Sequence, residues 1–188
     1  MSKINTIKPI SDLYFVAIVP PEPLLSEIEK LKLTACKRFN ACAALNSPPH
    51  ITLHMPFGWK RKKEDILYQF FDDYKSSIKP FIVKIEGVSH FGERVIFLSI
   101  EPNPTLMFFQ SDLAKSMKRN LNLFNVNYKN KPFHPHITLA FRDLKKQHFS
   151  EAFVYFQSLN YSDTFMASQF CLLKHEGKKW ETFKRFDF

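Results

Sequence analysis

The sequence predicts an α+β fold in which two similar lobes, related by a pseudo-two-fold axis, face each other across a central cleft. Strand-like and helical segments follow the same order twice, roughly over residues 10–90 and again over residues 92–188. The pentapeptide PHITL also occurs twice, at the same place in that order. We therefore predict a single bilobal domain over residues 1–188, with two mainly antiparallel sheets and helices on their outer faces.

The first half contains three predicted strands and two predicted helices. The apolar run at residues 13–19 is closed by Pro20 and Pro21, as expected of a buried strand. Apolar residues then recur at helical spacing over residues 24–39 and 66–78. Residues 50–57 and 81–88 have the length and composition of further strands.

The second half repeats this order and adds a hairpin. Residues 94–100 and 136–141 read as strands, and residues 106–121 and 149–156 as helices. Residues 164–174 and 180–186 read as two more strands. Glu176 and Gly177 lie between them and predict a tight turn.

Composition narrows the class of protein. The chain has 188 residues, of which 45% are hydrophobic, so it can bury a core. Only 4 residues are glycine, and no glycine-rich phosphate loop is present. The net charge of +9 favours polyanionic partners, nucleic acid first. The three cysteines, Cys36, Cys42 and Cys171, have no metal-binding spacing, and we expect reduced, buried thiols in a cytoplasmic protein.

The repeated PHITL is the feature that carries chemistry. Side chains alternate along a strand, so His50 and Thr52 share one face, as do His136 and Thr138. The isoleucine and leucine of each copy should pack beneath the helices. One copy could be an ordinary half-buried strand with polar residues toward water. That explanation requires only alternation, and it does not require the same polar residues twice.

With both His-x-Thr motifs intact, the sequence resembles the two-histidine (2H) phosphoesterase superfamily, which includes the 2′-5′ RNA ligase-like proteins. The resemblance extends over nearly the whole chain and implies a bilobal fold with the motifs facing each other. It also implies metal-independent opening of 2′,3′-cyclic phosphates on RNA ends or nucleotides, usually to 2′-phosphates. Reversible 2′-5′ RNA ligation is implied as a further activity. No cofactor is expected.

The two histidines suit that reaction because an imidazole can accept or donate a proton near neutral pH. We assign His136 as the base and His50 as the acid, although nothing in the sequence distinguishes them. The Thr52 and Thr138 hydroxyls can donate to phosphate oxygens. Arg142 lies at an even offset from His136 and could bind phosphate, or it could be a surface residue paired with Asp143. The family often has arginine one position earlier, where this chain has Phe141.

Other residues are weaker candidates. We expect His54 at the rim of the cleft, His134 in a buried or surface-paired position, and His175 within the predicted hairpin. The basic run could be a solvated face or a guide for a polynucleotide; it comprises Lys60, Arg61, Lys62 and Lys63. Core packing is the default interpretation of the aromatic residues near the motifs, which are Phe57, Trp59 and Phe91.

Two alternatives belong to different functional classes. The first is a non-catalytic module that binds RNA or a nucleotide in the same basic cleft. The second is a metal site, which we disfavour because histidines four apart on one strand cannot share a metal ion and no carboxylate or cysteine accompanies them. Its members would be His50, His54, His134 and His136. We expect a monomer without a membrane segment or an obligate protein partner.

Overall fold

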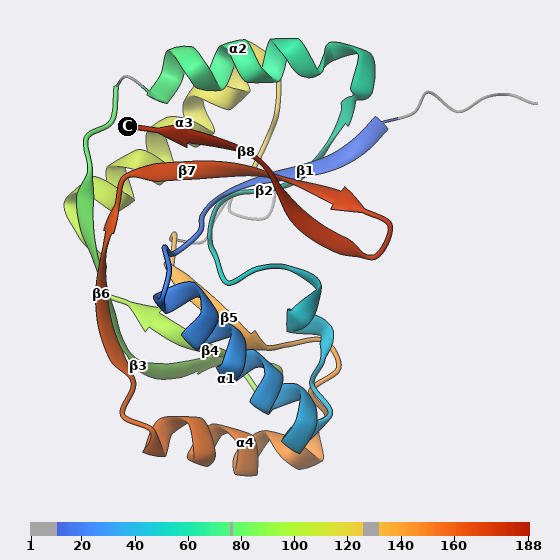
Figure 1. Ribbon diagram of the computed structural model, residues 1–188, viewed down its shortest axis with the longest axis vertical. Coiled ribbons are helices and arrows are strands. Elements are labelled where there is room, and N and C mark those ends of the chain that lie inside the picture. The colour runs from blue at the N-terminus through green and yellow to red at the C-terminus, as the bar shows by residue number, and fades with distance from the viewer. Residues whose placement is uncertain (1–10, 76, 126–131) are drawn as a thin grey trace, which may run out of the picture.

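The computed structural model describes residues 11–75, 77–125 and 132–188 (Figure 1). The strands are β1 (Ser11–Ile18), β2 (Ile51–Lys60), β3 (Phe81–Phe91), β4 (Val95–Ile100), β5 (His136–Ala140), β6 (Ser162–Ala167), β7 (Gln169–Glu176) and β8 (Lys179–Asp187). The helices are α1 (Leu24–Phe39), α2 (Glu64–Lys75), α3 (Pro104–Leu121) and α4 (Lys146–Ser158), with short 3-10 turns η1 (Ala43–Asn46) and η2 (Arg61–Lys63). The chain is therefore an α+β protein, as predicted.

The expectation of two sheets is wrong, because all eight strands form one curled antiparallel sheet. Its order is β6-β3-β4-β5-β2-β1-β7-β8. The sheet is joined at its middle by a single residue pair, Ile51 on β2 with Ile137 on β5. Four strands lie on either side of that pair. This pairing covers part of two edges that separate sheets would leave open.

Each half of the sheet takes strands from both sequence repeats. The strand β3 of the first repeat pairs with β4 and β6, while β7 of the second repeat pairs with β1. The segment predicted as one strand over residues 164–174 is accordingly two strands interrupted at Ser168. The chain leaves β3 there and crosses to β1, so one continuous strand cannot serve both partners. In Figure 1 this crossing runs along one side of the molecule.

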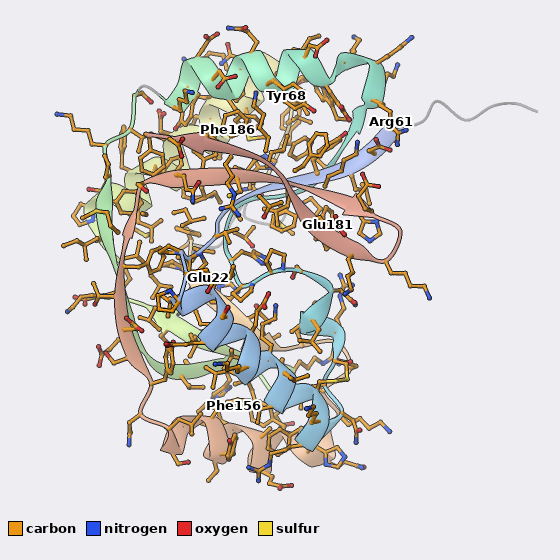
Figure 2. The ribbon with its side chains drawn as sticks, in the orientation of Figure 1. Glu22, Arg61, Tyr68, Phe156, Glu181 and Phe186 are labelled. Carbon is orange, nitrogen blue, oxygen red and sulfur yellow. A yellow bond between two sulfur atoms is a disulfide. The ribbon has the colours of Figure 1, made fainter. Side chains whose placement is uncertain are left out.

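The helices cover the two ends of the sheet as pairs. Figure 1 places α1 and α4 together at one end, and α2 at the other. Phe156 of α4 packs beside Phe39 of α1, with ring centroids 6.0 Å apart. At the opposite end Phe71 of α2 lies 5.3 Å from Phe186 of β8. Figure 2 shows Phe156 and Phe186 at these two positions, so the aromatic content fills two connected ends of one core.

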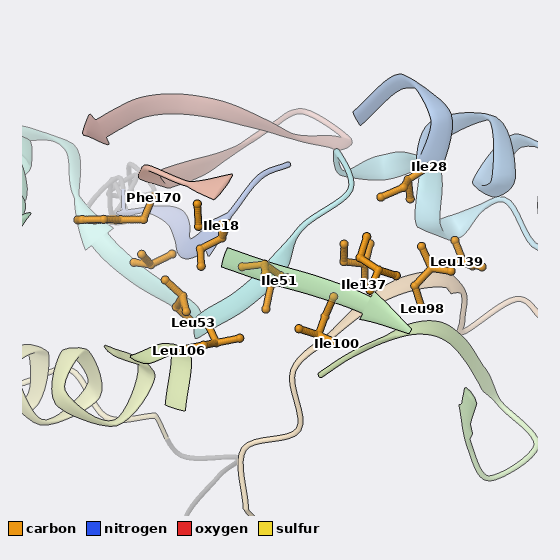
Figure 3. Close-up of a cluster of buried hydrophobic side chains, with 14 of the residues drawn as sticks. Ile18, Ile28, Ile51, Leu53, Leu98, Ile100, Leu106, Ile137, Leu139 and Phe170 are labelled. Carbon is orange, nitrogen blue, oxygen red and sulfur yellow. The ribbon is translucent and has the colours of Figure 1, made fainter. Parts of the chain in front are cut away.

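The apolar face of the repeated motif lies in that core. Ile51, Leu53, Ile137 and Leu139 are all fully buried. Figure 3 shows these four side chains in one cluster with Ile18, Leu98 and Ile100. The predicted alternation of the two HITL segments is confirmed for these positions, and it turns the histidines and threonines to the opposite face of the sheet.

The expectation of three reduced thiols is wrong for two of them. Cys36 and Cys42 form a disulfide, whereas Cys171 is a buried free thiol. The chain reverses after α1 at Asn40, whose φ is +56°, and the amide of Ala41 returns to the carbonyl of Ala35. This reversal brings the two cysteine Cα atoms to 4.2 Å. Spacing alone did not reveal it, because the outcome depends on the left-handed turn.

A buried ion cluster holds the β7–β8 hairpin near its turn. The ammonium of Lys174, which is 5% exposed, lies 2.9 Å from Asp12 and 2.8 Å from Glu64. Arg61 of the basic run also binds Asp12, at 2.9 Å. The cluster therefore joins β7 to β1 and to the start of α2, and one member of the basic run is already paired. None of the helices in the described segments is long and apolar enough to span a bilayer.

Candidate active site

The centre of the sheet brings the two motifs together. Ile51 of β2 lies opposite Ile137 of β5 in antiparallel register. Continuing that register by one residue in each direction sets His50 opposite Thr138 and Thr52 opposite His136. Opposed residues of an antiparallel pair have Cα atoms roughly 4.5–5.5 Å apart. The four polar residues, which we call the His–Thr quartet, therefore share one face around a local two-fold axis.

Both histidine rings are held in the same way. Nδ1 of His50 donates to the carbonyl of Pro48 at 2.7 Å, and Nδ1 of His136 donates to the carbonyl of His134 at 2.7 Å. A carbonyl can only accept, so the hydrogen sits on Nδ1 and Nε2 carries the lone pair of the neutral ring. Nothing in the described residues bonds to either Nε2 atom. Each ring thus offers one oriented nitrogen for proton transfer.

The threonines complete the quartet. Thr52 and Thr138 are partly buried, and within the described residues neither hydroxyl forms a hydrogen bond. A hydroxyl can donate one hydrogen bond and accept others. The quartet therefore presents two ring nitrogens and two donors to whatever occupies this face.

A pocket of about 190 Å³ lies beside His50 and Thr52. Its wall includes Ser47 and Asn46 from the approach to β2, and the turn of the β7–β8 hairpin on the other side. The hairpin prediction is confirmed, with Gly177 at a φ of +61° in the turn. His175 lies in the hairpin as expected, and together with Lys178 and Trp180 it lines the pocket.

Aromatic rings back both histidines. The ring of Phe15 lies 4.8 Å from His50 and 4.8 Å from Trp180. On the other side, the ring of Phe97 lies 5.0 Å from His136 and 4.3 Å from Phe91. These contacts restrict how each imidazole can tilt. They also place an apolar wall on each flank of the quartet.

Arg142 reaches the pocket by a route that differs from the predicted one. We expected it on the face of a strand that extends to residue 141, but β5 ends at Ala140. Arg142 instead adopts a φ of +56° and lines the pocket with Phe141. Asp143 accepts hydrogen bonds from the amides of Cys42 and Ala43, at 2.7 and 2.8 Å. Asp143 therefore ties the Arg142 turn to η1, and the exposed guanidinium lies 5.0 Å from the Phe141 ring.

Burial sets the protonation of the two histidines. It is the largest cause that lowers the pKa of His50, to about 4, and the charges of Lys32 and His136 lower it further. Burial also lowers the pKa of His136, with a smaller contribution from the charge of His134. Both rings are therefore neutral at pH 7 when the pocket is empty. A bound phosphate anion acts in the opposite direction and favours a protonated ring.

The expectation that His54 lies at the rim is wrong. His54 is 1% exposed, and its Nδ1 bonds to the carbonyl of Met55. The register between β1 and β2 shifts between Tyr14 and Val16, beside His54. Such a shift moves a side chain to the other face of the sheet. His54 therefore packs against Phe57 in the core, 5.5 Å between ring centroids.

The remaining candidates are dispersed. His134 is exposed, and its ring contacts that of Phe91, 5.3 Å away. Phe57 belongs to the core, while Phe91 is 40% exposed beside His136. Trp59 donates to the carbonyl of Lys63 and lines a separate hollow with Lys60. The basic run thus does not line the pocket of His50.

The residues that could have formed a metal site do not converge. His54 faces the core, away from the other three histidines of the proposed set. In residues 11–75, 77–125 and 132–188, no group of three or more His, Cys, Asp or Glu side chains is arranged to hold a metal ion.

The sequence did not identify Lys32 of α1, a buried residue near the site. Its ammonium donates to the carbonyl of Ser47, which lies three residues before His50. The signal was present, since Lys32 falls four residues after Ile28 and three before Ala35 on the apolar face of the helix. Phe15 and Trp180 were also missed, because nothing in their local sequence distinguishes them from other core aromatics.

Known structures share this fold. The protein TT0787 of Thermus thermophilus matches with a TM-score of 0.67 and 18% identity, over 93% of this chain and 97% of that one. Escherichia coli LigT complexed with 3′-AMP matches with a TM-score of 0.65 and 20% identity, over 95% and 99%. Kluyveromyces marxianus Usb1 matches with a TM-score of 0.50 and 11% identity, over 96% and 99%.

Family comparison agrees with the fold and with the paired motifs. No curated protein matches the sequence. The model of the 2′-5′ RNA ligase superfamily matches residues 20–179, which include both PHITL segments. Membership of this superfamily supports an enzyme that acts on phosphodiester bonds. The chain therefore belongs to the 2′-5′ RNA ligase superfamily of two-histidine phosphoesterases.

Proposed function

We propose that this protein hydrolyses 2′,3′-cyclic phosphates on RNA ends or nucleotides, releasing 2′-phosphates. The single observation that carries the proposal is the His–Thr quartet, in which both rings offer Nε2 because Nδ1 is bonded to a backbone carbonyl. Membership of a phosphodiesterase-type superfamily supports the reaction class. The cyclic substrate is the part that this proposal adds.

The reaction needs one base and one acid. As the bond from water oxygen to phosphorus forms, one Nε2 takes a proton from the water. The other ring is protonated at Nε2 once the phosphate anion is bound, and as the bond from phosphorus to O3′ breaks it gives this proton to O3′. The product is a 2′-phosphate with a free 3′-hydroxyl, and the protons return to their starting sites through solvent. Two oriented imidazoles on either side of phosphorus can supply both transfers.

The quartet can also stabilise the negative charge on the phosphate. The hydroxyls of Thr52 and Thr138 can donate to the two non-bridging oxygens, where negative charge must be held. Arg142 lines the pocket beside His50 and Thr52 and can contribute a charge-assisted hydrogen bond to the phosphate or to a flanking nucleotide. We propose these three residues as the phosphate-binding set.

The aromatic flanks suit a nucleoside. Trp180 and Phe15 border the pocket on the His50 side, and Phe91 is partly exposed on the His136 side. Aromatic rings of this kind can stack on a base of any identity. LigT has been crystallised with 3′-AMP, with NADP+ and with ATP, which supports a nucleotide as the ligand of this cleft. With a 5′-hydroxyl in place of water as the nucleophile, the same steps would join a cyclic end to that hydroxyl.

A substrate panel tests the proposal. Purified protein would be incubated in excess chelator with the four 2′,3′-cyclic nucleotides and with an RNA oligonucleotide that ends in a cyclic phosphate. Phosphorus NMR separates the cyclic, 2′-phosphate and 3′-phosphate signals. We expect conversion to the 2′-phosphate, and loss of conversion in His50→Ala and His136→Ala. His148→Ala on α4 is the matched control and should keep full activity.

The panel also decides between hydrolysis and mere binding. Tight binding of cyclic-ended RNA without turnover would support the non-catalytic module instead. Activity that depends on added metal, or that survives both alanine substitutions, would exclude the two-histidine chemistry. A monomeric state and a cytoplasmic location stay predictions, to be checked by light scattering and by localisation of the tagged protein.

A further inference from the structure

A second hollow lies next to the pocket of His50, on the side of His136. Its volume is about 700 Å³, and its wall includes Phe91, whose ring lies 5.1 Å from that of His136. The turn between β3 and β4 forms one side of it, and the segment from β5 into α4 forms the other. Phe141 and Arg142 line both cavities, so the two spaces share a boundary. We call the second space the His136-side hollow.

Each of the two cavities has an aromatic ring in its wall. Trp180 lines the pocket beside His50, and Phe91 lines the His136-side hollow. Phe91 packs against buried Phe97, 4.3 Å between ring centroids, yet it remains 40% exposed. Exposed aromatic rings can stack on a nucleobase of any identity. The cleft therefore offers a stacking surface on both sides of the His–Thr quartet.

The His136-side hollow carries more positive than negative charge. Arg94 and Arg142 are exposed on it, and neither guanidinium forms an ion pair within the described segments. The carboxylate of Glu93 also lines it, but this group is paired with Lys146 at 2.8 Å. The carboxylate of Asp143, next to Arg142, accepts from two amides at η1. Two arginines thus stay available, and a guanidinium can bind phosphate with two parallel hydrogen bonds.

Regular structure holds the walls of the hollow in place. Phe91 and Val95 are paired across the β3–β4 hairpin, and Gly92 takes a φ of +56° in its turn. The base of the hollow is apolar, since Leu144 is buried and Phe141 is half-buried. An apolar base, an aromatic ring and a few charged groups are the usual features of a site for a nucleotide.

The shared boundary of the two cavities suits a continuous RNA strand. When the cyclic phosphate lies on the quartet and its nucleoside in the pocket beside His50, the next phosphate of the strand is the one on the 5′ side of that nucleoside. Arg142, which lines both cavities, can bind this linking phosphate. The preceding nucleotide then lies beyond Arg142, and a mononucleotide would leave that space empty.

We propose that the His136-side hollow is a second nucleotide subsite, which binds the nucleotide preceding the cyclic end. Arg94 and Arg142 bind the linking phosphate, and the base of the preceding nucleotide stacks on Phe91. This assignment rests on the proposed function and narrows it, because it makes RNA ends of two or more nucleotides better substrates than cyclic mononucleotides.

Calorimetry on product-like ligands tests the subsite without requiring turnover. The ligands are 2′-AMP and the dinucleotide ApA with a terminal 2′-phosphate. We expect the dinucleotide to bind the wild type at least about 10-fold more tightly, as one stacked base and one bound phosphate allow. Arg94→Ala and Phe91→Leu should each remove most of this advantage. The matched controls on α3, Arg119→Ala and Phe108→Leu, should keep it.

A third ligand separates the phosphate contact from the base contact. It is the same dinucleotide with an abasic sugar at the preceding position. Its affinity should still fall in Arg94→Ala and should no longer depend on Phe91. Thermal melts confirm that each variant is folded, and exposed Arg94 lies outside the core. Equal affinity of the wild type for 2′-AMP and the dinucleotide would overturn the subsite, and so would an advantage that survives both variants.

Hydrolysis rates extend the test to the reaction. We expect kcat/KM for ApA with a terminal 2′,3′-cyclic phosphate to exceed that for 2′,3′-cyclic AMP by at least about 10-fold, and the ratio to fall toward one in Arg94→Ala. A ratio near one in the wild type would overturn the preference for RNA ends. A folded wild type that opens neither substrate would refute the proposed function, and the binding comparison would still decide whether the subsite exists.

Discussion

The two PHITL segments have the same sequence but different surroundings. The ring of His50 shares a pocket with Ala43 and Asn46 of η1 and lies beside the Phe15–Trp180 pair, and buried Lys32 donates to the carbonyl of Ser47. The ring of His136 is flanked by Phe97, exposed His134 and partly exposed Phe91. The two identical motifs therefore present the same side-chain atoms to a ligand, while the neighbouring elements determine the pKa of each histidine. Two identical motifs therefore lie in different electrostatic surroundings.

The largest effect should come from removing either ring. His50→Ala and His136→Ala should each lower kcat by about 10²–10⁴-fold, because each removes one proton transfer. Steady-state rates on a 2′,3′-cyclic nucleotide give the comparison. If one variant kept more than a tenth of the wild-type rate, the two motifs would not be equal partners in catalysis.

Removal of either threonine hydroxyl should have the next largest effect on kcat. Thr52→Val and Thr138→Val keep the shape of the side chain and remove the donor to phosphate, so each should lower kcat by about 100-fold. The fully buried neighbours Ile51 and Ile137 keep the backbone register in both variants. Equal losses would indicate that both hydroxyls bind the phosphate. An unaffected variant would remove that threonine from the phosphate-binding set.

Substitution of Arg142 tests whether the turn after β5 contributes to substrate binding beside His50. Arg142→Ala should raise KM by about 10-fold, as expected when one charge-assisted hydrogen bond to phosphate is lost. Arg119→Ala on α3 provides a control of equal charge change. An unchanged KM would assign Arg142 to the solvated surface instead.

The Cys36–Cys42 disulfide should stabilise the part of the fold that lies next to His50. Cys36→Ser should lower the free energy of unfolding by about 2 kcal/mol, since it opens a short closed loop between α1 and η1. Urea denaturation, with reduced wild type as a parallel sample, measures the loss. We expect kcat to stay within about two-fold at 25 °C, because the Ser47–His50 segment is also held by Lys32. Equal stability of oxidised and reduced protein would contradict this.

The smallest expected difference between the two histidines is their effect on the free energy of unfolding at acidic pH. The pKa of His50 is about 4 in the folded protein and near ~6.5 when unfolded, so the unfolded chain binds more protons between these values. The free energy of unfolding should therefore fall as pH drops from about 6.5 to 4. His50→Gln should flatten this slope more than His136→Gln does, in urea titrations across that range. The opposite order would contradict the stronger depression at His50.

Much of the fold was predictable because it follows from local patterns. Helical spacing identified all four α-helices of the described segments, and alternation in HITL correctly placed Ile51 and Leu53 inside. The pairing of strands was less accessible. The sheet is continuous because Ile51 meets Ile137, and the strand after residue 162 breaks at Ser168 to change partners. No local sequence pattern indicates the Ile51–Ile137 pairing or the interruption at Ser168.

The site was predictable where it depends on residue type and not where it depends on irregular backbone. His50, Thr52, His136 and Thr138 lie on one face as their periodicity indicated. His54 does not, because a register shift beside it turns the ring into the core. Arg142 reaches the pocket through a left-handed residue rather than along a strand. Such irregularities arise from tertiary contacts, such as those of Asp143 with η1.

The most direct measurement is a phosphorus NMR time course of 2′,3′-cyclic AMP in excess chelator, with the wild type beside the His50→Ala/His136→Ala double variant. The paired-histidine site predicts that the cyclic signal of the wild-type sample disappears while a 2′-phosphate signal grows, and that the double variant leaves the substrate intact. Unchanged substrate with folded wild-type protein, or equal turnover by the double variant, would contradict it.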